Sequence, residues 1–183
     1  MFPVGGVEVM LLGVALSALL CAGLAALLRR RLGLVGAVSL ALLAWSLVVI
    51  GLITLIPANG APGIVLAEDR LDTCSWDIGG PAPEGFWIFA GGQRLLNAVV
   101  FVPPGALLVV LAARSLRWSW VIVPVGLACL AAYSVAIELT QLGLARLDRA
   151  CDVTDIIDNV TGAVTGALIG IVLAVLLRPW RRR

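Results

Sequence analysis

Five long apolar segments dominate the sequence, and they restrict the fold more than any other feature. Each is roughly 17–25 residues long, which is the length that an α-helix needs to cross a hydrocarbon layer about 30 Å thick. The chain of 183 residues is 61% hydrophobic, whereas soluble domains are about 45–50% apolar. We therefore predict an all-α membrane protein, a bundle of five transmembrane helices at about residues 7–28, 34–56, 95–113, 118–144 and 155–177.

The arginines divide unequally between the two ends of these predicted helices. All 13 basic residues are Arg, and nine of them fall on one side: Arg29, Arg30, Arg31, Arg114, Arg117, Arg178, Arg181, Arg182 and Arg183. Every Asp and Glu lies on the opposite side or in the membrane half next to it. Because cytoplasmic loops are enriched in Lys and Arg, we predict that the N-terminus is outside and the C-terminus is in the cytoplasm.

The segments also predict one membrane domain without a separate soluble domain. Residues 1–32 hold an additional N-terminal transmembrane helix, with an acidic residue before it and arginines after it, which is not the order of a signal peptide. Residues 33–178 form the main transmembrane domain, with an extracytoplasmic loop at about 57–94. Residues 179–183 are a basic cytoplasmic tail.

Polar residues inside the predicted helices fall at one level, just inside the extracytoplasmic interface. Asn97 is near the outer start of its helix, and Glu138 lies roughly 27–30 Å beyond the Trp118/Trp120 belt at 1.5 Å per residue. Polar groups are costly inside a membrane, so we expect a shared polar cluster. Its candidate members are Asn97, Glu138, Gln141, Arg149, Asp152, Asp155 and Asn159.

These residues have structural and functional interpretations. Glu138 is either a structural carboxyl, protonated or paired with Arg146 or Arg149, or a contact for a ligand or cation in an outward-facing pocket. Asn97 and Gln141 fit interhelical hydrogen bonds, and the loop acids fit solvated side chains. The chain has no His, which excludes histidine-based catalysis. Without a recognisable nucleophile or metal spacing, we predict no metal and no cofactor, and the catalytic residues, if any, stay unassigned.

Glycines and cysteines give two further predictions. Gly162, Gly166 and Gly170 recur every four residues, a spacing that lets another helix approach closely. We expect this helix to pack on a neighbour through them and to present Asp155 and Asn159 to that neighbour's outer end.

Cys74 and Cys151 fall in loops on the predicted extracytoplasmic side, where disulfides persist. We predict a disulfide between them that ties the long loop over the polar cluster. Cys21 and Cys129 lie within apolar segments, where thiols usually act as small packing residues.

The ordered set of motifs resembles the VanZ-like family over about Leu40 to Leu176. The matching motifs are Thr54–Leu55–Ile56–Pro57, Asn97-x3-Phe101-x-Pro103-x-Gly105, Ser134-x3-Glu138-x2-Gln141 and Arg149-x2-Asp152-x2-Asp155-x3-Asn159-x2-Gly162-x3-Gly166. The family consists of small bacterial multi-pass membrane proteins, and its founding member accompanies glycopeptide-resistance genes and confers low-level resistance to teicoplanin.

The resemblance implies a cytoplasmic-membrane protein of the bacterial cell envelope. Its expected partners are membrane lipids and either a lipid-linked cell-wall precursor or a lipoglycopeptide, and no nucleic acid. A protein that binds or modulates such a ligand is favoured. The alternative is an enzyme that acts on a lipid-linked substrate at the outer face, with Glu138 and the Asp152/Asp155 pair as acid/base groups or cation ligands. A third possibility is a purely structural partner subunit.

Overall fold

The computed structural model of the chain describes residues 6–56, 73–76, 87–144 and 151–178. Within these residues, four helices are long and apolar enough to cross a membrane: α1 (Val7–Leu55), α2 (Trp87–Ala112), α3 (Ser119–Leu144) and α4 (Val153–Leu177). Large apolar side chains stay exposed along them; Leu20, for example, is 76% exposed and Leu176 71%. Lipid is the solvent that suits such a surface, so the fold is a membrane helix bundle.

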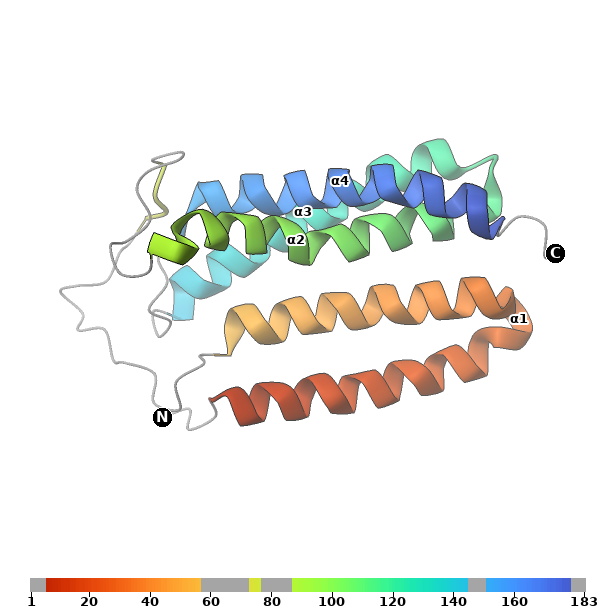
Figure 1. Cartoon of the computed structure of the whole chain (residues 1–183), viewed down its shortest axis with the longest axis horizontal. Helices are drawn as coiled ribbons and strands as arrows, with labels where there is room; N and C mark the ends of the chain where they lie inside the picture. Colours follow the sequence, from red (N-terminus) through yellow and green to blue (C-terminus); the bar gives the residue numbers. More distant parts are fainter. Residues whose placement is uncertain (1–5, 57–72, 77–86, 145–150, 179–183) are drawn as a thin grey trace.

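α1 explains why the structure has four such helices where the sequence predicted five. Gly33 interrupts α1 with a φ of 67° and a ψ of 170°, values that glycine adopts readily because it lacks a Cβ. The chain reverses there, and the arms of α1, residues 7–32 and 34–55, lie side by side (Figure 1). Trp45 Nε1 donates a hydrogen bond to the Val14 carbonyl at 3.2 Å across the two arms. The first two predicted spans are thus arms of one interrupted helix.

The reversal of α1 is fixed to the end of α2. A short 3-10 turn, η2 (Ala113–Ser115), follows α2 and carries Arg114. The Arg114 guanidinium donates to the carbonyl of Leu32 and lies against Gly36. Carbonyls at the end of a helix lack partners within the helix, so this arginine satisfies one of them and holds the hairpin in place.

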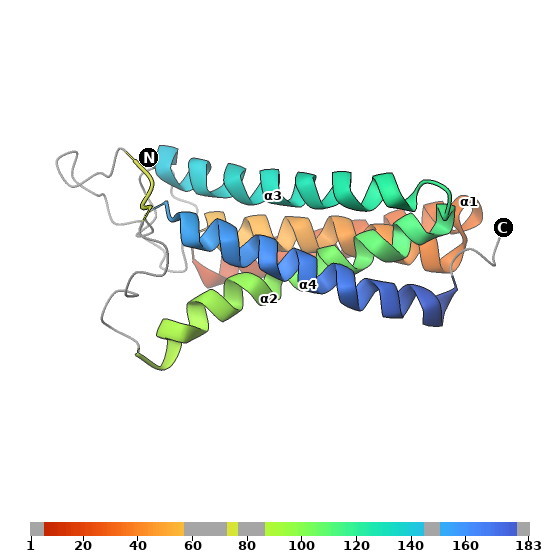
Figure 2. The same ribbon diagram turned by 90° about the horizontal axis from the view of Figure 1, so that it is seen from above.

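α2 and α4 run in the same direction, cross each other and make the closest helix contact in the described chain (Figure 2). A Cβ added to any of three α4 glycines would overlap a backbone carbonyl of α2. The pairs are Gly162 with Ala98, Gly166 with Val102 and Gly170 with Ala106. We call these three pairs the glycine seam. Gly105 of α2 makes the reciprocal contact with the Ala163 carbonyl.

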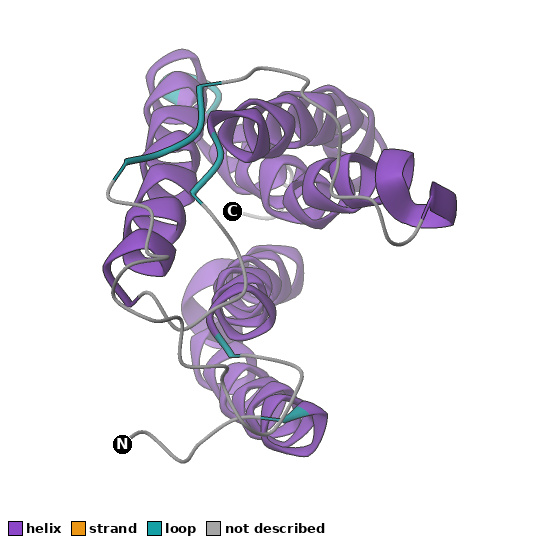
Figure 3. Cartoon of the chain, turned by 90° about the vertical axis from the view of Figure 1, so that its left-hand side faces the viewer, coloured by secondary structure: helices purple, strands orange, loops and turns teal. Residues whose placement is uncertain are grey.

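α3 joins this pair to the second arm of α1. Tyr133 Oη donates to the Leu47 carbonyl at 2.7 Å. The buried core has one or two side chains from each helix: Ile50, Phe101, Leu130, Ile137 and Ala163. Viewed along the helices, the arms of α1 lie to one side of the group that α2, α3 and α4 form (Figure 3).

Two helices begin before the predicted membrane spans. α2 begins at Trp87, but the part of it that is apolar enough to cross a membrane begins at Arg94, next to the predicted Leu95. α4 begins at Val153 rather than at Asp155, because Asp152 caps the helix. Apart from residues 73–76, the part of the predicted loop before Trp87 lies outside the described residues, as does the tail at 179–183.

Candidate functional site

Most of the polar residues that the sequence singled out lie at one end of the bundle, where α2 and α4 begin and α3 ends. We call this the polar end. Several of its side chains are buried, including Glu138 and Gln141, each 3% exposed. Its described members are Arg94, Asn97, Ser134, Glu138, Gln141, Asp152, Asp155, Asp158 and Asn159.

A disulfide holds the chain just before α4. Cys74 and Cys151 are bonded, with a Cα–Cα separation of 4.6 Å, so the predicted bridge is present. Ser75 continues the attachment through two backbone hydrogen bonds. Its N–H donates to the Cys151 carbonyl at 2.8 Å, and its carbonyl accepts from the N–H of Val153 at 3.1 Å. Residues 73–76 are therefore fastened to the start of α4.

Glu138 faces the start of α4. Its Oε2 accepts a hydrogen bond from the backbone N–H of Asp152 at 3.1 Å. The Asp152 carboxylate in turn accepts from the Thr154 N–H at 2.8 Å, which makes Asp152 the N-cap of α4. Helix N-termini stabilise negative charge, so both carboxylates lie where the backbone favours them. The buried acid of α3 and the first turn of α4 are thereby linked.

An ion pair that the sequence analysis missed joins α2 to α4. Arg94 donates from Nε and Nη2 to the two carboxylate oxygens of Asp158, at 2.9 and 3.0 Å. The Arg94 side chain is half-exposed, whereas that of Asp158 is 12% exposed. The available signal was the spacing, because Asp158 precedes Gly162 by one turn on the same face of α4.

This pair corrects the expected role of α4. We predicted that the glycine stripe would present Asp155 and Asn159 to the neighbouring helix. Asp158 instead meets α2, and Asn159 Nδ2 donates to Ser134 Oγ of α3 at 2.9 Å, with both side chains buried. Asn159 lies three residues before Gly162, whereas the observed contact with α2 continues at intervals of four residues, which selects Asp158.

Gln141 and Asn97 are not part of the Arg94–Asp158 ion pair or of the Asn159–Ser134 hydrogen bond. Gln141 Nε2 donates to the Thr54 carbonyl at 3.0 Å, so it attaches α3 to the end of α1. Asn97 Nδ2 is buried and has no hydrogen-bond partner among the described residues. Asp155 lies in the first turn of α4, where its N–H donates to the Asp152 carbonyl at 3.2 Å. Arg149, the remaining predicted member, lies outside the described residues, as do Arg146 and Asp148.

In the described residues, the polar end thus contains several separate hydrogen bonds, an ion pair and one buried amide donor without an acceptor. With apolar helices around it, this arrangement defines a multi-pass membrane protein whose polar residues collect at one end. The chain belongs to the VanZ/LLP1 family, which matches residues 37–177. The match takes in the second arm of α1 and the whole of α2, α3 and α4, and leaves out the first arm. No curated protein and no solved structure matched the chain.

Proposed function

We propose that the chain is a bacterial cell-envelope protein that binds the polar part of a lipid-linked cell-wall precursor or of a lipoglycopeptide at the polar end. The observation that carries this proposal is the Asn97 amide, whose Nδ2 is buried without an acceptor in the part of the chain that the structure describes. A buried donor without a partner costs about 1–3 kcal/mol. A ligand oxygen that accepts from Asn97 would recover this free energy.

The position of Asn97 supports a shared site. It precedes Ala98, which touches Gly162, and Gly162 follows the buried Asn159 by less than one turn. Asn97 is therefore nearly level with the Asn159–Ser134 hydrogen bond, and Arg94 lies one turn before it on α2. A ligand there would meet a buried amide and a half-exposed guanidinium.

Binding is favoured over catalysis because the carboxylates that would act as acid and base already bond to the backbone. Glu138 accepts from the Asp152 N–H, and Asp152 accepts from the Thr154 N–H. Both bonds fix the start of α4, which is a positioning role. The enzyme alternative requires one of these carboxylates to leave its backbone partner and reach a substrate.

We further infer that the chain crosses the cytoplasmic membrane five times, with the N-terminus outside. The reversal of α1 at Gly33 and the common direction of α2 and α4 support this arrangement. The nine arginines set the orientation. The polar end and its disulfide then face the extracytoplasmic side, where disulfides persist.

Binding can be measured with the full chain in lipid nanodiscs, using teicoplanin and an undecaprenyl-diphosphate-linked muropeptide as probes. We expect one probe to bind and Asn97→Ala to weaken it about tenfold, because the substitution removes the amide of the site. Glu138→Gln should also weaken it, because it replaces the carboxylate whose bond to the Asp152 N–H fixes the start of α4. Thr140→Ala is the matched control, since Thr140 is exposed on α3 and its hydroxyl bonds to its own helix. Failure of both probes to bind, or unchanged affinity in both site variants, would refute the proposal.

A susceptibility assay tests the envelope role. Expression in a teicoplanin-sensitive host should raise the inhibitory concentration of teicoplanin if the lipoglycopeptide is the ligand. Glu138→Gln should remove this effect without lowering the amount of protein in the membrane. A parallel fall in abundance would instead indicate that Glu138 has a structural role.

A further inference from the structure

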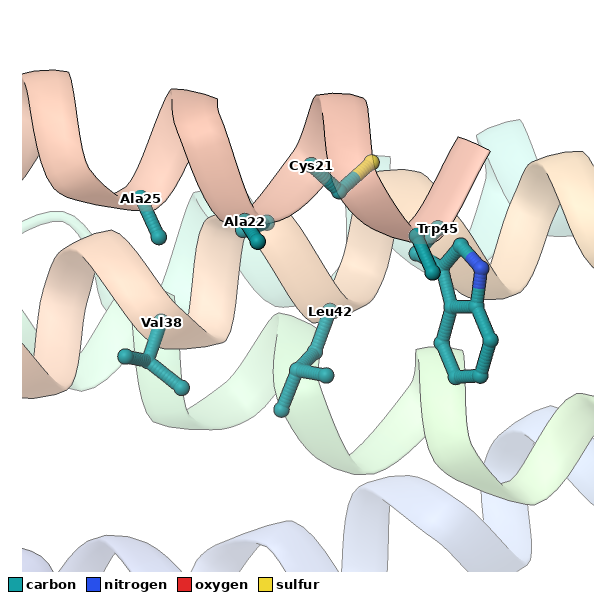
Figure 4. A pocket seen from close by; sticks show the side chains of 8 residues that line it. Cys21, Ala22, Ala25, Val38, Leu42 and Trp45 are labelled. Atoms are coloured by element: carbon teal, nitrogen blue, oxygen red, sulfur yellow. The ribbon is translucent and has the colours of Figure 1, made fainter. Parts of the chain in front are cut away.

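An apolar cavity of about 370 Å³ lies between the two arms of α1. Figure 4 shows small side chains from the first arm and larger ones from the second around it. They are Cys21, Ala22 and Ala25 on one arm and Val38, Leu42 and Trp45 on the other. None of the described residues that line the cavity is charged, so its chemistry suits hydrocarbon rather than a polar headgroup.

The arms are braced on both sides of this cavity, so they cannot simply close over it. Toward the start of α1, Leu52 packs against Gly13, and the Trp45 indole is hydrogen-bonded to the Val14 carbonyl. Toward the reversal, Arg114 holds the Leu32 carbonyl next to Gly33. The alanines between these braces are too short to fill the space.

The occupant must be thin and apolar. The cavity is partly open to the surface of the bundle, where lipid is the solvent, and water would find no polar partners along this lining. A second helix does not fit, because a helix with side chains is about 10 Å wide, and a volume of 370 Å³ is that of about one turn. A single hydrocarbon chain from the surrounding bilayer meets both conditions.

Positive charge lies one turn beyond the cavity. Arg29, Arg30 and Arg31 follow Ala25 at the end of the first arm, and all three are exposed. At a rise of 1.5 Å per residue, Arg29 lies about 6 Å further along the helix axis than Ala25. Arginines at the membrane surface attract anionic lipid headgroups.

We propose that the arms of α1 form a binding site for one anionic phospholipid. An acyl chain occupies the cavity between the arms, and the phosphate lies at Arg29–Arg31. Half of the cavity lining and all three arginines belong to the first arm, outside the part of the chain that matches the family. It is independent of the ligand proposed for the polar end.

The test is native mass spectrometry of the full chain titrated with phosphatidylglycerol or with phosphatidylcholine of the same acyl chains. We expect phosphatidylglycerol to bind at least about fivefold more tightly, because one engaged arginine provides a preference of that size. Equal affinity for the two lipids would overturn the proposal. Arg29→Gln, Arg30→Gln and Arg31→Gln together should remove the preference, and a preference that persists would also overturn it.

A pair of substitutions tests whether the acyl chain of the lipid lies in the cavity. Ala22→Phe fills the cavity and should abolish saturable binding, whereas Ala26→Phe, at an exposed position that does not line the cavity, should leave it unchanged. Trp45 provides a second readout in a chain whose other five Trp are Phe. Its fluorescence should be quenched by phosphatidylglycerol with brominated acyl chains. Unchanged lipid binding in Ala22→Phe would refute the site. Quenching of Trp45 that changes with protein concentration but not with the concentration of the brominated lipid would also refute it.

Discussion

Arg94 of α2 and Asp158 of α4 form a two-point ion pair at the head of the same contact that the glycine seam makes further along. Each lies one turn before the first seam pair, Ala98 and Gly162. The contact between α2 and α4 therefore combines an ion pair at the polar end with close backbone packing further along the two helices. Membrane helices gain little from the hydrophobic effect, so packing and polar bonds of this kind hold them together.

The ion pair should be coupled energetically. We expect Arg94→Gln and Asp158→Asn each to lower the thermal midpoint of the detergent-solubilised protein, and the double variant to lose less than both losses combined. Arg94→Gln should have the larger effect, because it leaves the buried Asp158 carboxylate without this partner, whereas the Arg94 guanidinium that Asp158→Asn leaves behind is half-exposed and can be solvated. Midpoints can be read by fluorescence-detected size exclusion after heating. Additive losses would mean that the two side chains act independently.

The glycine seam should not tolerate a methyl group. A Cβ at Gly166 would overlap the Val102 carbonyl, and backbone can move away only if the whole of α2 shifts. Gly166→Ala should therefore destabilise the protein by about 1–3 kcal/mol, the usual range for overpacking. Gly23→Ala is the control, because nothing lies within 4 Å of the added atom, and it should be neutral or stabilising through helix propensity. Equal effects of the two changes would contradict the seam.

The disulfide should protect two of the four cysteines from modification. In denatured, non-reduced protein we expect a maleimide to label Cys21 and Cys129 only, and all four cysteines after reduction. Cys74→Ser and Cys151→Ser should each lower stability by about 2–4 kcal/mol, and their combination should lower it no further. Mass spectrometry counts the labels. Four labels without reductant would show that the bridge does not form.

The inferred topology can be tested with reporters. A fluorescent protein fused after Arg183 should be fluorescent, and alkaline phosphatase at the same position should be inactive, because the C-terminus is expected in the cytoplasm. Phosphatase inserted between residues 144 and 151 should be active. The opposite pattern would reverse the assignment of the polar end to the extracytoplasmic side.

Several features followed from the sequence because they depend on local composition or on compartment. The apolar segments predicted membrane helices, since length and hydrophobicity alone decide whether a helix can cross a bilayer. The pairing of Cys74 with Cys151 was predictable because both fell in loops on the same side. The ordered motifs pointed to the VanZ-like family, to which the chain belongs.

Side-chain partners required the tertiary structure. The sequence placed Glu138, Gln141 and Asn159 at one level, but helix rotation decides which neighbour each one meets. That rotation directs Gln141 to α1, Asn159 to Ser134 and Glu138 to the Asp152 N–H. Periodicity along one helix cannot supply the rotation, because it arises from packing between helices. For the same reason, the sequence alone did not predict the Arg94–Asp158 pair or the cavity of α1. The apolar helices on which both lie were determined by the sequence itself.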